Sequence, residues 1–177
     1  MQPIYTHGTP IAGTSRMSIV NNRETLLFLL SVIIAFTPIQ AKSAEQIPLP
    51  ADYCHWQVSN FAIEKPLCNL QGDPQRGRKI AIDSHTGNCL ACHMMPIPEE
   101  PLHGTVGPPL YGISARLTEG QIRLRIVDEQ KVNPMTIMPG FYSDPRLANR
   151  VGNDYWGKTF LTAQQVEDIV AYLKTIK

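Results

Sequence analysis

The stretch Asn88-Cys89-Leu90-Ala91-Cys92-His93 governs the interpretation of the whole sequence, because it contains the pattern C-x-x-C-H. This pattern is the attachment signal for c-type haem. Two thiols three positions apart can add to the two vinyl groups of one porphyrin, and the histidine that follows is then carried beneath the iron as a ligand. The motif predicts one covalently bound haem c held by Cys89, Cys92 and His93.

Two other kinds of site also use closely spaced cysteines. A thioredoxin-like redox pair has no need of His93 and normally follows a strand, whereas a helix-like segment precedes Cys89 here. A zinc site would have to recruit Cys54 and Cys68, which are 14 positions apart and not in a paired spacing. The haem interpretation is favoured over both.

An export signal precedes the motif. Residues 26–37 are almost unbroken apolar, follow Arg16 and Arg23, and are succeeded by the small-residue stretch 41–44. This is the layout of a secretory signal peptide. The run is shorter than the roughly 20 apolar residues of a membrane-spanning helix, so a stable membrane anchor is disfavoured. We expect residues 1–44 to be removed, with cleavage near Ser43 or Ala44, and the protein to reach the periplasm of a Gram-negative bacterium.

The composition excludes another class of function. The 177 residues carry 16 Lys and Arg against 15 Asp and Glu, a net charge of +1, without a basic run. Nucleic-acid binding is therefore disfavoured. The 15 prolines and the 7% of aromatic residues suggest a small core bounded by irregular loops, which suits a fold completed by a large cofactor.

The second axial ligand decides whether such a haem binds small molecules or mainly passes electrons. The two methionines that directly follow His93 are too close to it to reach the opposite face of a porphyrin. Met135 and Met138 remain, in a proline-containing loop that can present a thioether rigidly, although filling a core is the usual role of a methionine. His103, in a proline-bounded loop, is a rival ligand, whereas His55 and His85 are expected to be ordinary polar residues.

Helix-start signals lie on both sides of the motif. Asp73-Pro74 supplies an N-cap and a first-turn proline for a helix that leads to it. Residues 118–121 and 162–165 are capping boxes of the form Thr-x-x-Gln, each followed by apolar residues at helical spacing. The sequence predicts a small all-α haem domain over residues 73–177.

Residues 45–72 fit none of these helices, and we expect them to form an irregular N-terminal extension on the haem domain. They contain Cys54 and Cys68. Unligated cysteines tend to pair in an oxidising compartment, so a disulfide between these two is expected, with a contribution of about 3 kcal/mol in the chain-entropy model. A reactive or haem-ligating thiolate is the alternative, and no neighbouring positive charge favours it.

Three features resemble class I cytochromes c. Met138-Pro139 after a short apolar stretch resembles their distal loop, which favours Met138 as the distal ligand. Residues 107–112, Gly-Pro-Pro-Leu-Tyr-Gly, resemble the segment G-P-x-L-x-G whose proline carbonyl accepts the Nδ1 proton of the proximal histidine, which implies that role for Pro108. Gly77 and Tyr172 resemble the glycine and the aromatic residue at which the first and last helices cross.

Residues 73–177 as a whole resemble the SoxX family, the monohaem subunit of the SoxAX cytochrome that begins periplasmic thiosulfate oxidation. The resemblance is carried by residues 87–93, by residues 104–121 continuing to 133–142, and by residues 157–164 with the last helix. It implies a class I cytochrome c fold and a haem of raised potential with His93 and Met138 as its axial ligands.

The same resemblance implies electron transfer, without catalysis by this chain. A SoxA-type partner, dihaem or monohaem, would form with it an L-cysteine S-thiosulfotransferase complex, in which a cysteine-ligated haem of SoxA oxidatively joins thiosulfate to a cysteine of the SoxYZ carrier. The two electrons would pass to a further cytochrome. Arg123, Arg125 and Tyr111 are candidates for facing the partner or the haem edge, although a solvated helix face is the expected place of both arginines.

Two alternatives from other classes remain open. One is a free electron shuttle to an oxidase, without an obligate partner. The other is a ligand-binding or peroxidase-like haem protein, which requires an open distal position.

Overall fold

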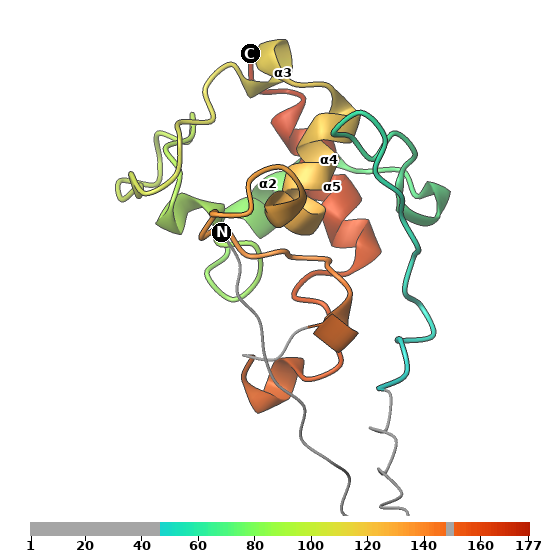
Figure 1. Ribbon diagram of the computed structural model, residues 1–177. Helices are drawn as coiled ribbons and strands as arrows, with labels where there is room; N and C mark the ends of the chain where they lie inside the picture. Colours follow the sequence, from blue (N-terminus) through green and yellow to red (C-terminus); the bar gives the residue numbers. More distant parts are fainter. Residues whose placement is uncertain (1–46, 148–150) are drawn as a thin grey trace, which may run out of the picture. The chain divides into compact units, whose positions relative to one another are not determined.

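The computed structural model describes residues 47–147 and 151–177, so the leader expected at residues 1–44 lies outside the described part of the chain. Within the described ranges the fold is helical, without a β-strand, and one isolated bridge pairs Ser59 with Ala62. The α-helices are α2 (Pro74–Ile82), α3 (Ile113–Arg116), α4 (Glu119–Asp128) and α5 (Ala163–Leu173) (Figure 1). The 3-10 turns are η1 (Leu67–Asn69), η2 (Cys89–Ala91), η3 (Glu129–Lys131), η4 (Pro145–Leu147) and η5 (Asn153–Tyr155).

Side-chain caps fix where the three main helices begin. The Asp73 carboxylate accepts the N–H groups of Gln75 and Arg76 at 2.8 and 3.1 Å, and Pro74 opens α2. Both predicted capping boxes are closed in α4 and α5, because each threonine hydroxyl and each glutamine side chain bonds the backbone N–H of the other residue. The expected starts of all three helices are confirmed.

Helices α2 and α5 cross at very close range. A Cβ atom on Gly77 would overlap the carbonyl oxygen of Asp168 and would lie 2.9 Å from the amide nitrogen of Ile169. Only glycine allows this approach of two helix backbones, which confirms that Gly77 lies at the crossing. The atoms nearest to Gly77 are backbone atoms of α5, while Tyr172 is buried one turn further along α5.

The core lies between α2, α4 and α5. The apolar stripe of α5 is completely buried, and α4 adds Leu124 and Val127, which have no exposed surface. Within the described ranges, no helix combines the length and apolar character that crossing a bilayer would require.

The extension before α2 is attached to α4 and to the loop that follows it. A disulfide joins Cys54 to Cys68, as expected. The Cys54 amide donates a hydrogen bond to the Tyr142 hydroxyl at 2.7 Å, and the Ile63 amide donates to the carbonyl oxygen of Gly120 at 3.0 Å.

Arg123 differs from the expectation of a solvated helix face. Its side chain is 2% exposed and forms a two-pronged ion pair with Glu167 of α5, at 2.8 and 2.9 Å. The Ile63 carbonyl accepts a further bond from Arg123 at 2.7 Å, and the Leu67 amide donates to Glu167 at 2.9 Å. The physical reason is that the extension covers this face of α4 and supplies polar partners there, as a buried ion pair requires.

Candidate haem site

A cavity of about 650 Å³ opens between the C-x-x-C-H turn, the loop that contains the two methionines, and the helices α4 and α5. All five site residues expected from the sequence line it: Cys89, Cys92, His93, Pro108 and Met138. Apolar side chains form much of its wall, namely Leu110, Ile113, Ile122, Ile126, Phe141, Leu161, Ile169 and Leu173. The structure therefore brings residues from distant parts of the sequence to one apolar pocket.

The C-x-x-C-H residues form a compact turn. Asn88 adopts a left-handed conformation with φ 47°, and the turn η2 begins at the next residue. The Cys92 and His93 amides both donate to the Cys89 carbonyl, at 3.2 and 2.9 Å. This turn keeps both thiols and the imidazole on the wall of one cavity, and both thiols are free.

The pKa of the Cys89 thiol differs from that of a cysteine in a redox-active pair. Burial raises its pKa from 9.0 to about 12, so the group is a neutral thiol at physiological pH. Reactive C-x-x-C pairs have a lowered thiol pKa instead. The zinc alternative also loses its donors, because the Cys54–Cys68 disulfide occupies the two other cysteines. Among the described residues no group of three or more His, Cys, Asp or Glu side chains is placed to hold a metal ion.

The ring of His93 is held by a backbone carbonyl. Its Nδ1 atom lies 2.7 Å from the carbonyl oxygen of Pro108. A carbonyl only accepts, so Nδ1 carries the proton and Nε2 keeps its lone pair for a metal. A Cβ atom on Gly107 would overlap the imidazole ring, so this packing requires a residue without a side chain.

The two candidate distal methionines differ in their surroundings. Both line the cavity, but Met135 is 87% exposed whereas Met138 is half-buried. The Met138 amide donates to the Thr136 hydroxyl at 3.1 Å, which ties that part of the loop. The partial burial of Met138 supports its choice over Met135.

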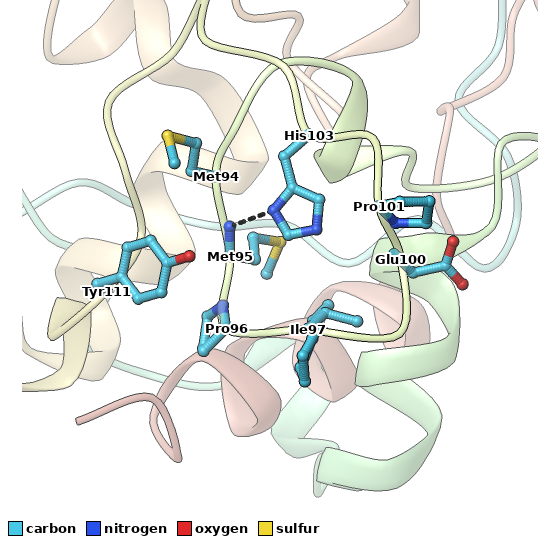
Figure 2. Close-up of a pocket in the computed structure, with 9 residues that line it drawn as sticks. Met94, Met95, Pro96, Ile97, Glu100, Pro101, His103 and Tyr111 are labelled. Atoms are coloured by element: carbon cyan, nitrogen blue, oxygen red, sulfur yellow. Dashed lines mark hydrogen bonds between the residues drawn. The ribbon is translucent and has the colours of Figure 1, made fainter.

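The rival ligand His103 does not line this cavity. It lies with Tyr111 on a second, shallower hollow of about 590 Å³, and its Nδ1 atom accepts the Met95 amide proton at 3.2 Å (Figure 2). The side chains of His55 and His85 are exposed and also lie outside the cavity lining. The three histidines thus lie apart from the cavity that His93 lines, whereas both methionines of the loop line it.

Three charged residues line the cavity: Arg125, a candidate for the haem edge in the sequence, and Arg116 and Glu129, which the sequence did not single out. Arg125 Nη1 donates to Glu129 Oε1 at 2.6 Å, Glu129 is buried, and both line the cavity. Arg116 also lines it and donates to the carbonyl oxygens of Pro109 and Tyr111, at 3.0 and 3.1 Å. The i,i+4 spacing of Arg125 and Glu129 was the one available signal for their pairing.

The donor set and the wall fit a covalently held haem. Two free thiols lie on the cavity wall with an imidazole whose Nδ1 is held by the Pro108 carbonyl, and a half-buried thioether lines the same space. The apolar wall matches the faces of a porphyrin, and the arginines match its carboxylates in charge.

Comparisons with known proteins agree with this site. The family model described as cytochrome c matches residues 74–177. A crystal structure of SoxXA from P. pantotrophus is similar to the chain with a TM-score of 0.63 and 35% sequence identity, covering 69% of this chain and 94% of that chain. No curated protein sequence matches the chain.

Proposed function

The chain belongs to the cytochrome c family and within it to the SoxX group, and we propose that it is the periplasmic electron-transfer subunit of a thiosulfate-oxidising SoxAX complex. The observation that carries the proposal is the 35% identity to a SoxXA chain over 94% of that chain's length. The cavity that gathers Cys89, Cys92, His93 and Met138 supports the same conclusion.

Each site residue has a distinct part in holding the haem c of this chain. Cys89 and Cys92 would form the two thioether links, and His93 and Met138 would be the axial ligands. Pro108 accepts the Nδ1 proton of His93, which orients the ring and strengthens Nε2 as a donor. When bound, the haem accepts and releases one electron at a time.

The surroundings of the site favour electron storage over substrate binding. A methionine at the distal position would leave no open coordination position for a sulfur compound, and the apolar wall would keep water away from a bound haem and so raise its potential. The chain's other cysteines, Cys54 and Cys68, are paired with each other, so they offer no thiol to thiosulfate. The sulfur chemistry therefore belongs to the partner.

In the proposed reaction a carrier thiol and thiosulfate are joined by a new sulfur–sulfur bond, with loss of one proton and two electrons. The carrier would be SoxYZ-like and the catalytic subunit a SoxA-type cytochrome. This chain would pass the two electrons, one after the other, to a further cytochrome. Removal of residues 1–44 after export would place it in the periplasm with these partners.

The test is thiosulfate-dependent mass increase of the purified carrier with an electron acceptor present. We expect no increase with this chain alone and an increase when the SoxA-type subunit is added, in a stable heterodimer with this chain. A mass increase without any partner would contradict the subunit role. Failure to bind a SoxA-type subunit would favour the free electron shuttle.

A further inference from the structure

Residues 103–110 form successive backbone hydrogen bonds with the C-x-x-C-H turn, here called the haem-binding turn, and with the residue that follows it. The Gly104 amide donates to the Leu90 carbonyl and the Gly107 amide to the Cys92 carbonyl, both at 2.7 Å. The Leu110 amide donates to the Met94 carbonyl at 2.9 Å. The Pro108 carbonyl, which accepts from His93, lies between the last two of these contacts along the 103–110 segment.

The first residue of the segment bonds through its side chain. His103 Nδ1 accepts the amide proton of Met95, a residue without exposed surface, at 3.2 Å (Figure 2). An amide N–H only donates, so Nδ1 is unprotonated and the neutral ring carries its proton on Nε2. That Nε2 atom is buried and has no hydrogen-bond partner among the described residues.

Burying the unpaired Nε2–H donor of His103 is unfavourable. The benefit that offsets this cost is the hydrogen bond that Nδ1 accepts. This hydrogen bond holds the backbone amide of Met95, which lies two positions after His93. The other end of the segment holds Met94 through Leu110. The two ends of the 103–110 segment are thus attached to Met95 and Met94, the residues that directly follow His93.

Residues 103–110 have little room to move away from their observed position. A Cβ atom on Gly104 would overlap the carbonyl oxygen of Ala91 and lie 2.8 Å from Cys92 Cα, and one on Gly107 would lie 2.6 Å from His93 Nδ1. The segment is therefore pressed against the turn at Gly104 and against the imidazole at Gly107. Its position sets the position of the Pro108 carbonyl.

We propose that His103 is a positioning residue for His93: by holding the Met95 amide, it keeps residues 103–110 against the haem-binding turn and so keeps the Pro108 carbonyl on His93 Nδ1. The inference rests on the proposed function, in which His93 is the iron ligand. His103 acts through the segment and does not touch the cavity that the ligand faces.

The test compares replacements of His103 in the haem-loaded, ferrous protein by nitrogen-15 NMR. His103→Leu removes the acceptor, so exchange of the Met95 amide proton and of the His93 Nδ1 proton should rise on the order of tenfold, the effect of losing one hydrogen bond. The midpoint potential should rise as well, because a weaker bond to Pro108 makes His93 a weaker donor to the oxidised metal.

Two amide variants keep the test decisive if the leucine variant does not assemble. His103→Asn places its side-chain oxygen near the position of Nδ1 and should keep wild-type exchange and potential, whereas the longer His103→Gln places its oxygen beyond that position and should behave like leucine. His85→Leu, at an exposed histidine, is the matched control and should change none of these values.

Unchanged His93 Nδ1 exchange in His103→Leu, or equal behaviour of the asparagine and glutamine variants, would overturn the proposal. Its failure is distinguishable from failure of the proposed function, because the assigned His93 ring resonances of ferrous wild type, which a haem shifts strongly when it is bound to that ring, establish separately whether His93 is a ligand. If His93 were not a ligand, the proposed function would fail while exchange at Met95 still measured the bond to His103.

Discussion

Met135 and Met138 lie three positions apart on one loop, and both face the cavity that Cys89, Cys92 and His93 line. A thioether can stay bound to a metal only if the loop holds it there. Met138 is half-buried with its amide tied to Thr136, while Met135 is 87% exposed. The difference in burial makes the two residues a matched pair for a test.

We expect Met138→Ala to abolish the weak near-infrared sulfur-to-iron band of the ferric protein, to lower the midpoint potential, and to admit carbon monoxide to the ferrous protein. The physical reason is that a thioether ligand favours the reduced metal and fills the distal position. Met135→Ala should leave all three unchanged. The reverse pattern would assign the ligand to Met135, and no effect in either variant would contradict methionine ligation.

Residues whose role is decided within a few positions could be predicted from the sequence. The placement of Cys89, Cys92 and His93 on the wall of one cavity is an example, because a single turn of the chain holds all three. Arg123 is the opposite case. Its partners Ile63 and Glu167 lie 60 and 44 positions away, and no local pattern shows that the extension covers this face of α4.

Among the helices too, features fixed by neighbouring residues could be predicted, and those fixed by distant residues could not. Caps at Asp73, Thr118 and Thr162 bond amides two or three positions ahead, so these starts were predictable. The short helix α3 was not predicted, because it follows Gly112 in a left-handed conformation with φ 65° and has no capping side chain. Its position depends instead on the far end of the chain, since the Ser114 hydroxyl donates to the Ile176 carbonyl at 2.6 Å.

The crossing of α2 and α5 should be intolerant of one added methyl group. Gly77→Ala would force the Cβ atom against the Asp168 carbonyl and should lower the free energy of unfolding by about 1–3 kcal/mol or prevent assembly. Gly152→Ala is the control, because nothing lies within 4 Å of the added atom. It should leave stability unchanged or raise it by up to about 1 kcal/mol. Equal unfolding temperatures for the two haem-loaded variants would contradict the crossing.

Asp168 makes the same crossing sensitive to acid. Burial alone would raise the pKa of its carboxyl group, but hydrogen bonds from Arg76, the Asp73 amide and Gln164 outweigh burial and hold the pKa below its ordinary value of 3.8. A carboxylate with a lowered pKa contributes stability above its unfolded pKa, and this contribution is lost as the pH falls through the folded value.

We therefore expect Asp168→Asn to unfold at a lower temperature than wild type by an amount that is constant above pH about 4 and shrinks below it. Thermal unfolding of both proteins across this range measures the difference. Asp154→Asn, at an exposed carboxylate, should show no such trend. A difference that stayed constant far below pH 4 would contradict the role assigned to the ionised carboxylate.

At the scale of the molecule, the haem domain and the extension are held together by polar contacts as well as by packing. The Arg123–Glu167 pair binds both the Ile63 carbonyl and the Leu67 amide, and the Cys54–Cys68 disulfide closes the extension around them. The cavity is completed by residues from turn η2 to helix α5. A covalently held haem would therefore contact segments from the C-x-x-C-H turn to helix α5, which suits a chain with few aromatic residues for a core of its own.

We propose that this chain is an exported cytochrome with one haem on one pair of cysteines. Intact-mass spectrometry of the periplasmic protein, followed by mass mapping of its peptides, tests it most directly. We predict a chain cleaved near Ser43 or Ala44 that carries the mass of one haem, located on the peptide with Cys89 and Cys92 and resistant to acid acetone. A retained leader, a chain without haem, or haem that acid acetone extracts would contradict the account.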